Sequence, residues 1–340
     1  MKGKRARHIE PRQNAGSLAE VVRSGDRRAL ARAITLIEST HAEHRAAASI
    51  LLEQLAPYTG QSIRIGITGV PGVGKSTFIE ALGNYVIDDG HRVAVLSIDP
   101  SSALSGGSIL GDKTRMQELS RRAEAFIRPS PAGETRGGVA RHTRETILVC
   151  EAAGFNVVIV ETVGVGQSET AVADMTDVFI LLLLPSGGDE LQGMKRGIVE
   201  LADLVLVNKA DGELDAAAQR AAAEYANALR LIHPRSASWT VPVKTCSALT
   251  GVGIAEAWAT ILRYHEALSK SGELATRHGE QARAWMWAET AENLIATLKD
   301  DPKVRSRVSK LEAAVTKGRT PPTVAARELL DIFLKQRHKE

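Results

Sequence analysis

A glycine-rich segment between residues 69 and 77 has the residue types and spacing needed to bind phosphate. Gly69 to Ser76 fit the pattern G-x-x-x-x-G-K-[ST], and an apolar run, Ile63–Ile67, precedes them. Glycines let backbone N–H groups turn toward a phosphate, and the N-terminus of a following helix adds partial positive charge. We expect Lys75 to reach the β- and γ-phosphates of a nucleotide and the Ser76 hydroxyl to bind Mg²⁺. The residues predicted to contact the phosphates are Gly69, Val70, Pro71, Gly72, Val73, Gly74, Lys75, Ser76 and Thr77.

A second polar segment, Asn208-Lys209-Ala210-Asp211, follows the apolar run Leu204–Val207 and has the N-K-x-D pattern typical of guanine recognition. The Asp211 carboxylate can accept hydrogen bonds from N1–H and the exocyclic amine of guanine together. Adenine lacks that amine and leaves the carboxylate unpaired, and sites of this kind discriminate by about 10⁴-fold. A backbone N–H just past the apolar run Val241–Val243 can donate to guanine O6. The residues predicted to contact the base are Asn208, Lys209, Asp211, Ser247, Ala248 and Leu249.

Acidic residues directly follow two of the apolar runs, where Asp99 and Glu161 stand. The carboxyl ends of parallel strands meet at one edge of a sheet, so both carboxylates are expected beside the phosphate loop. Glu161 can hold Mg²⁺ through water, and Asp99 can position the attacking water or support the metal. Asp112 and Arg115 lie on a loop long enough to change conformation. The predicted metal ligands are Ser76, Asp99, Asp112 and Glu161, and the predicted catalytic residues are Lys75, Asp99, Arg115 and Glu161.

A glycine-containing loop at residues 185–196 follows the apolar run Val178–Leu184 and is expected at the same edge of the sheet. Its glycines suit a segment that changes conformation with the bound nucleotide. The loop has no phosphate-loop or guanine pattern of its own. A solvated turn followed by the start of a helix is the alternative interpretation of these residues.

The elements that must position these residues alternate between strands and helices from about residue 61 to residue 265. Short aliphatic runs separated by amphipathic segments predict a parallel sheet with helices on both faces. The predicted strands are Ile63–Ile67, Val93–Ile98, Val157–Val160, Val178–Leu184, Leu204–Val207 and Val241–Val243. The predicted fold is therefore α/β, of the P-loop GTPase class, with a mostly parallel sheet flanked by helices.

Helical extensions are expected at both ends of this fold. Residues 16–57 have apolar residues at helical spacing, and from residue 281 the chain reads as helices with a break at Gly318–Pro322. We divide the chain into three parts on this basis. They are a basic tail with an N-terminal helical extension at 1–58, a G domain at 59–268 and a C-terminal helical arm at 269–340.

The composition indicates a soluble globular protein with an aliphatic core. The 340 residues are 44% hydrophobic, 24% charged and only 4% aromatic. The net charge is +3, and the basic excess lies in residues 1–12, so no nucleic-acid-binding face is expected. Cys150 and Cys246 form no disulfide or metal pattern, and the longest apolar run is too short to span a membrane. With no secretory signal after the basic start, we expect a cytoplasmic protein without a membrane or nucleic-acid partner.

Several of these segments together resemble one family, the MeaB (ArgK) GTPases, over nearly the whole chain. The segments that carry the resemblance are Val70–Thr77, Asp99–Ser102, Gly106–Met116, Arg128–Pro131, Glu161–Ser168 and Gly188–Gln192. Members of this family are G-protein chaperones of methylmalonyl-CoA mutase and related cobalamin-dependent acyl-CoA mutases.

The resemblance implies a function beyond nucleotide binding. Proteins of this kind bind GTP and GDP with Mg²⁺, hydrolyse GTP slowly alone and hydrolyse it faster with the mutase. They gate the delivery of adenosylcobalamin from an adenosyltransferase and protect or reactivate the mutase. They are homodimers whose C-terminal helices form the dimerisation arm. The 185–196 loop corresponds to a switch that couples to the mutase, with Gly188, Asp189, Glu190, Gln192 and Lys195 as its predicted residues.

Other functions share parts of these patterns. A nickel-chaperone GTPase has the same nucleotide site but binds metal through Cys and His, whereas the His residues here are scattered and Cys150 and Cys246 have no partner nearby in the sequence. A GTP-binding scaffold that does not hydrolyse GTP is a further alternative. A protein kinase is not supported, because the chain has no H-R-D and no D-F-G. Trp285 and Trp287 read as aromatic anchors that pack a helix or a dimer.

Overall fold

The computed structural model describes residues 11–39, 41–99, 116–131, 136–162, 168–185, 196–230 and 235–337. The chain divides after His278 into two compact units. The long helix α14 (Glu273–Asp300) begins in the first unit and continues into the second. The three-part division expected from the sequence stays a prediction.

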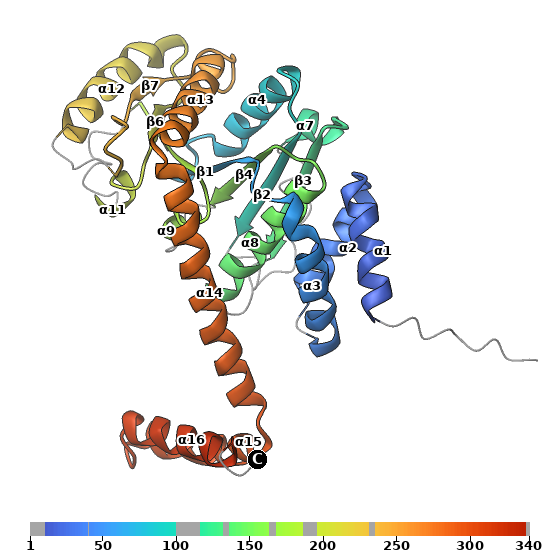
Figure 1. The fold of residues 1–340 in the computed structure, drawn as a ribbon. Helices are drawn as coiled ribbons and strands as arrows, with labels where there is room; N and C mark the ends of the chain where they lie inside the picture. Colours follow the sequence, from blue (N-terminus) through green and yellow to red (C-terminus); the bar gives the residue numbers. More distant parts are fainter. Residues whose placement is uncertain are drawn as a thin grey trace, which may run out of the picture. The chain divides into compact units, whose positions relative to one another are not determined.

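The first unit is built on a sheet of seven strands in the order β3-β2-β4-β1-β5-β6-β7 (Figure 1). Every neighbouring pair is parallel, which confirms the predicted sheet. The strands are β1 (Ile63–Gly69), β2 (Val93–Asp99), β3 (Ala125–Pro131), β4 (Val157–Thr162), β5 (Val178–Leu183), β6 (Leu204–Val207) and β7 (Val243–Thr245). Because β1 lies in the middle, its carboxyl end is surrounded by the ends of β4 and β5.

The aliphatic runs form these strands because both faces of the sheet are covered, so successive side chains enter different cores. In β2, Val93 and Val95 belong to one core, whereas Ala94 and Leu96 belong to the other. Each is fully buried. A strand covered on both faces therefore needs apolar residues at successive positions, rather than alternating apolar and polar residues.

Helices cover both faces of the sheet (Figure 1). One core contains residues of α4, α7 and α13, and the opposite core contains residues of α1, α2, α3, α8 and α9. A third cluster joins α11 and α12 to β5 and β6. These helices and two 3₁₀ turns are α1 (Pro11–Arg23), α2 (Arg27–Ile37), α3 (Ala42–Leu55), η1 (Ala56–Tyr58), α4 (Lys75–Asp88), α7 (Gln117–Arg121), α8 (Arg136–Ala152), α9 (Ser168–Ala173), α11 (Arg196–Val199), η2 (Gly212–Leu214), α12 (Asp215–Leu229) and α13 (Ile254–Ser271).

The N-terminal helices confirm the helical zone expected at residues 16–57. Helix α2 is a clear case, since the Asp26 carboxylate accepts a hydrogen bond from Ala29 N at 2.6 Å and caps its N-terminus. Leu30, Ile34 and Ile37 recur at helical spacing and are buried in the core shared with α8.

The second unit consists of the distal part of α14 with α15 (Pro302–Thr316) and α16 (Pro322–Arg337). The Asp301 carboxylate caps α15, and the expected break follows at Gly318, whose φ is 66°. Arg307 Nε donates to Glu328 Oε1 at 2.7 Å and links α15 to α16. None of the helices in the described segments is long and apolar enough to cross a membrane.

The ends of the interior strands differ from the predicted runs by no more than two residues, and the two edge strands differ most. β3 was not predicted, because Arg128 and two prolines interrupt its apolar pattern. β3 lies at an edge of the sheet, where a strand tolerates prolines that lack the N–H group needed for a second neighbour. At the other edge, β7 begins at Val243 and ends at Thr245, two residues later than the predicted run.

Candidate nucleotide-binding site

The glycine-rich loop joins the end of β1 directly to α4 at the carboxyl edge of the sheet. Gly69 and Gly74 have φ values of 155° and 94°. A Cβ at Gly69 would lie 2.5 Å from Leu182 O, and one at Gly74 would lie 2.7 Å from Asn208 Nδ2. Both positions require glycine, because β5 and the predicted base-reading segment pack closely against the loop. The N-terminus of α4, which begins at Lys75, faces this loop with its unsatisfied backbone N–H groups.

The Lys75 ammonium lies at the beginning of the loop, where a phosphate is expected. The residue is only 8% exposed. Its Nζ donates to Gly69 O at 2.8 Å and to Val70 O at 3.3 Å. Phosphate oxygens are stronger acceptors for an ammonium than carbonyl oxygens, since their hydrogen bonds are charge-assisted on both sides. The phosphate oxygens of a bound nucleotide can therefore replace the two carbonyl oxygens as acceptors of the Lys75 ammonium, without a large movement of the side chain.

Glu161 lies beside the loop because β4 pairs with β1, with Glu161 opposite Ile67. The Ser76 hydroxyl donates to Glu161 Oε1 at 3.2 Å, and Glu161 is 5% exposed. A hydroxyl and a carboxylate at the same edge are hard oxygen ligands of the kind that Mg²⁺ prefers. The two residues therefore fit the predicted metal site.

Buried hydroxyl groups near the loop also contact the site residues, and the sequence did not predict them. Ser97 Oγ donates to Glu161 Oε2 at 3.5 Å, and Thr162 Oγ1 donates to Thr68 Oγ1 at 2.8 Å. All of these side chains are buried. The only signal in the sequence was a polar residue inside or next to an apolar run, two residues before Asp99 in the case of Ser97.

Asn208 connects the phosphate loop to the segment after β7. Its Nδ2 donates to Val73 O at 2.8 Å, and its Oδ1 accepts a hydrogen bond from Ala248 N at 3.0 Å. Cys246 Sγ lies 3.6 Å from the same oxygen. Asn208 is 1% exposed, so its geometry supports a bracing role rather than a direct contact with the base.

The predicted guanine-reading residues lie together after β6 and β7. Ser247 Oγ donates to Asp211 Oδ2, which orients the carboxylate. Lys209 has a φ of 62°, the only positive value of a non-glycine residue in the described part of the chain. Ala248 is buried, whereas Leu249 is 81% exposed. The structure therefore brings the loop, Glu161 and the base-reading residues to one edge of the sheet.

Other predicted residues have no described side chain. Asp99 ends β2 at the same edge, but only its backbone is described. Asp112, Arg115 and the predicted switch residues from Gly188 to Lys195 lie outside the described residues. Their roles stay predictions.

Several known proteins are similar to this chain in sequence and in fold. The family model described as "Methylmalonyl Co-A mutase-associated GTPase MeaB" matches residues 30–303. The GTPase ArgK of Escherichia coli is 44% identical, with 95% of this chain and 98% of its own length covered. The mitochondrial methylmalonic aciduria type A homolog of Mus musculus is 48% identical, with 92% and 78% covered.

A solved structure described as a LAO/AO transport system kinase is similar over 95% of this chain and 98% of its own, with a TM-score of 0.73 and 38% identity. The family match and these relatives confirm the resemblance inferred from the motifs. The chain belongs to the MeaB family of GTPases associated with methylmalonyl-CoA mutase.

Proposed function

We propose that this protein binds GTP and GDP with Mg²⁺, hydrolyses GTP and acts as a chaperone of methylmalonyl-CoA mutase or a related cobalamin-dependent acyl-CoA mutase. The observation that carries the proposal is the position of Asn208 between the phosphate loop and the Asp211–Ser247 pair. This arrangement joins phosphate binding and guanine recognition in one site. Membership of the MeaB family supports the association with a mutase.

In this proposal each residue of the site has its own role in GTP hydrolysis. Lys75 would exchange its carbonyl acceptors for phosphate oxygens and would stabilise the charge that develops on them in the transition state. Ser76 and Glu161, with Asp99 and Asp112, would hold Mg²⁺, which neutralises phosphate charge when it is bound. Asp99 would orient the attacking water, and Arg115 would add a further positive charge. Asp211 would select guanine.

The chaperone activity requires a link between this site and the mutase. We assign that link to the 185–196 loop, which follows β5 directly after the strand passes the phosphate loop. In this proposal the loop senses the nucleotide and makes the mutase accept or release adenosylcobalamin supplied by an adenosyltransferase. The mutase in turn accelerates a GTPase that is slow alone. The proposed location is the cytoplasm.

A homodimer through the C-terminal helices is part of the proposal. In the second unit an apolar groove of about 460 Å³ lies between α14 and α16. Leu294, Ile295, Leu330 and Leu334 line it and are each about half exposed. Because large contiguous apolar surfaces on soluble proteins are usually covered by a partner, a second copy of this chain is the occupant we propose.

The test measures nucleotide preference and turnover with the full chain. Calorimetry should give strong binding of GTP and GDP and much weaker binding of ATP. GTP turnover should then rise when purified methylmalonyl-CoA mutase is added, and Lys75→Ala serves as the variant without hydrolysis. Equal affinity for ATP and GTP would contradict the guanine site. Turnover that the mutase leaves unchanged would contradict the chaperone.

The same turnover measurement, with a separate titration of Ni²⁺, separates the alternatives. A non-hydrolysing scaffold would show no single-turnover hydrolysis even with the mutase. A nickel-chaperone GTPase would bind Ni²⁺ tightly through Cys and His, yet both cysteines are buried and the described residues contain no group of three or more metal-ligating side chains. Stoichiometric binding of Ni²⁺ without any response to the mutase would favour that alternative.

A further inference from the structure

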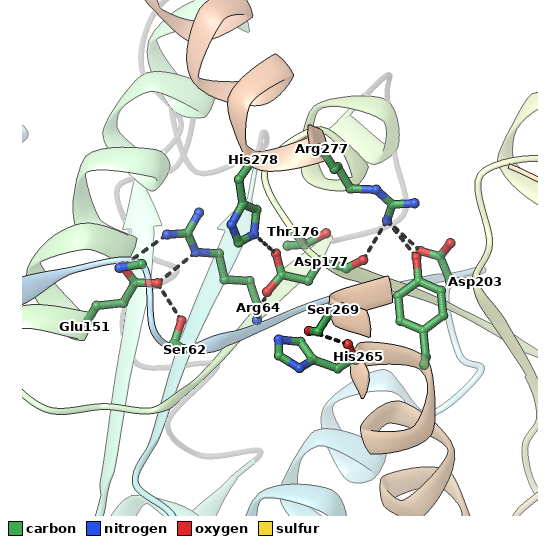
Figure 2. A network of polar contacts seen from close by, with 12 residues as sticks. Ser62, Arg64, Glu151, Thr176, Asp177, Asp203, His265, Ser269, Arg277 and His278 are labelled. Carbon is green, nitrogen blue, oxygen red and sulfur yellow. Dashed lines mark hydrogen bonds and ion pairs between the residues drawn. The ribbon is translucent and has the colours of Figure 1, made fainter. Parts of the chain in front are cut away.

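Polar contacts tie helices to the rest of the first unit at two places outside the phosphate loop. At the amino edge of the sheet, His278 Nε2 lies 2.6 Å from Asp177 Oδ1, and Arg277 Nη1 donates to Asp177 O at 2.8 Å (Figure 2). The nucleotide residues lie at the opposite edge, so this network holds the beginning of α14 rather than the site. The second place joins α7 to α4, the helix that begins with Lys75 and Ser76 (Figure 1).

Helix α7 is attached to α4 at both of its ends. At its beginning, Glu80 Oε1 accepts a hydrogen bond from Glu118 N at 2.8 Å. Met116, at the N-cap position of α7, provides no side-chain hydrogen bond of this kind. Since the first N–H groups of a helix have no partner within it, Glu80 supplies from α4 the cap that the sequence of α7 lacks. At the other end, Arg122 Nη2 donates to Asp88 Oδ1 at 2.8 Å.

Gly83, in the interior of α4, lets α7 pack closely against that helix. A Cβ at Gly83 would lie 2.8 Å from Leu119 Cδ2 and 3.0 Å from Leu119 Cδ1. Leu119 and Met116 are each 0% exposed and share one core with Phe78 of α4. Glycine inside a helix is destabilising relative to alanine, because its backbone loses more freedom. The close contact with Leu119 therefore explains why α4 has a glycine here.

The attachment of α7 matters because the sequence directly before it contains predicted site residues. Arg115 precedes Met116, and Asp112 lies four residues before Met116. An extended chain spans at most about 3.6 Å per residue, so fixing Met116 restricts Asp112 to within about 14 Å of it. Helix α4, to which Met116 is fixed, has Lys75 and Ser76 in its first turn. One helix therefore holds the phosphate-binding residues and also the end of the segment with the proposed metal ligand and catalytic arginine.

We propose that Glu80 and Gly83 are positioning residues for GTP hydrolysis. They hold α7 on α4 and thereby limit where Asp112 and Arg115 can lie relative to Lys75. The inference rests on the proposed function, because Glu80 and Gly83 act through the roles assigned there to Asp112 and Arg115. Orientation of this kind matters for the chemical step more than for the affinity of the product nucleotide.

Two variants of Glu80 in the full chain test the cap. Glu80→Gln keeps a side-chain oxygen that can accept from Glu118 N, whereas Glu80→Ala removes it. At saturating GTP and Mg²⁺, turnover should fall about five-fold in Glu80→Ala, the effect that corresponds to the loss of one helix cap, and stay parent-like in Glu80→Gln. GDP affinity should stay within about two-fold in both. The Glu118 amide should exchange faster with solvent only in Glu80→Ala. Parent-like turnover in Glu80→Ala would overturn the inference.

The role of Gly83 is tested by moving one carbon atom from α7 to α4. Gly83→Ala should lower turnover about three-fold, although alanine favours the helix, because the added methyl group displaces Leu119. Gly83→Ala combined with Leu119→Val nearly conserves the volume between the two helices and should restore most of the turnover. A double variant with no more turnover than Gly83→Ala would show that the contact with Leu119 is not the cause, and would overturn the role of Gly83.

Asp26→Ala is a matched control, because Asp26 caps α2 as Glu80 caps α7. It should lower stability and leave turnover parent-like, and an equal loss of turnover in Asp26→Ala would overturn positioning in favour of general destabilisation. Asp112→Ala and Arg115→Ala report separately on the proposed function. Parent-like turnover in both would contradict those roles and this inference with them. A loss of turnover in both, with parent-like turnover in Glu80→Ala, would contradict this inference alone.

Discussion

At the residue scale, we propose that the single side chain of Asp211 sets the nucleotide specificity. Its carboxylate is oriented by Ser247, which itself follows a strand at the edge of the sheet. The specificity of such a site comes from the penalty for leaving a buried or oriented polar group unpaired, rather than from the strength of the correct hydrogen bonds. A single change of donor and acceptor at this position should therefore change the preferred base.

We expect Asp211→Asn to weaken GTP binding and to favour xanthosine triphosphate. The amide can donate to the C2 oxygen of xanthine, where guanine has an amine. The loss for GTP should be on the order of 10²-fold or more. Calorimetry with both nucleotides checks this, and Asp215→Asn, on the exposed first turn of α12, is a matched control. Unchanged preference in Asp211→Asn would exclude this carboxylate from the base site.

Lys75→Ala should abolish most hydrolysis while the fold is retained. The variant loses a cation that meets developing charge in the transition state, and the loss of one such group costs about 10²–10³-fold in turnover. Asp99→Ala should lower turnover more than GDP affinity, because water orientation matters only for the chemical step. Turnover and GDP affinity are measured for each variant. Parent-like turnover of Asp99→Ala, with and without the mutase, would remove Asp99 from the mechanism.

The two cysteines should stay unreactive in the folded protein. Burial raises the pKa of Cys246 to about 12 and raises the pKa of Cys150 as well. At pH 8 the Cys246 thiolate is then about one part in 10⁴ of the folded protein. We expect no rapid alkylation of the native chain and alkylation of both thiols in denaturant. Rapid labelling of the native chain would show that the core around the labelled thiol opens easily, on the α8 side for Cys150 or after β7 for Cys246.

The same thiols make the stability depend on alkaline pH. Their pKa values are raised on folding, so the stabilisation is complete below the unfolded pKa of 9.0 and is lost as pH rises toward 12. The slope is at most about 1.4 kcal/mol per pH unit for each group. Denaturant unfolding between pH 8 and 11 measures this, and Cys246→Ala should show a shallower decline.

At the scale of elements, the sequence predicts the site better than it predicts the sheet's edges. The phosphate loop and the N-K-x-D segment are recognisable because each is a short motif that follows an apolar run in a strand with a neighbour on both sides. β3 and the exact position of β7 are not recognisable, since edge strands tolerate Pro, Arg and Lys. The hydroxyls of Ser97 and Thr162 also escape prediction, because their contacts depend on which strands become neighbours.

The 185–196 loop should couple the nucleotide to the mutase without contributing to nucleotide affinity. We expect Asp189→Ala and Lys195→Ala to keep parent-like GTP affinity and basal hydrolysis, and to lose most of the acceleration by the mutase. Coupling between two sites is typically about 1–3 kcal/mol. The measurement is GTP turnover with and without saturating mutase. Full stimulation of both variants by the mutase would contradict the coupling role and favour the alternative interpretation, a solvated turn.

At the scale of the whole molecule, the C-terminal helices should hold the dimer. A chain truncated before residue 281 keeps the beginning of α14 but lacks Leu294, Ile295 and α16, which line the apolar groove. We expect this chain to be a monomer that still binds GDP, and sedimentation of both chains checks it. A truncated chain that sediments as a dimer would move the interface onto the G domain.

The central position of β1 has a consequence for biosynthesis. Ile63 pairs with Val157 and Ile65 pairs with Val178, so the strand that carries the phosphate loop leaves the ribosome long before either neighbour exists. At a translation rate of about 5–20 residues per second, the nascent strand waits roughly 5–20 s with both edges unpaired. The guanine-reading residues emerge later still, Asn208–Asp211 after β6 and Ser247–Leu249 after β7. The predicted base-reading site is therefore complete only when about three quarters of the chain has been translated, and until then a bound nucleotide can contact the phosphate loop but not the whole guanine-reading set.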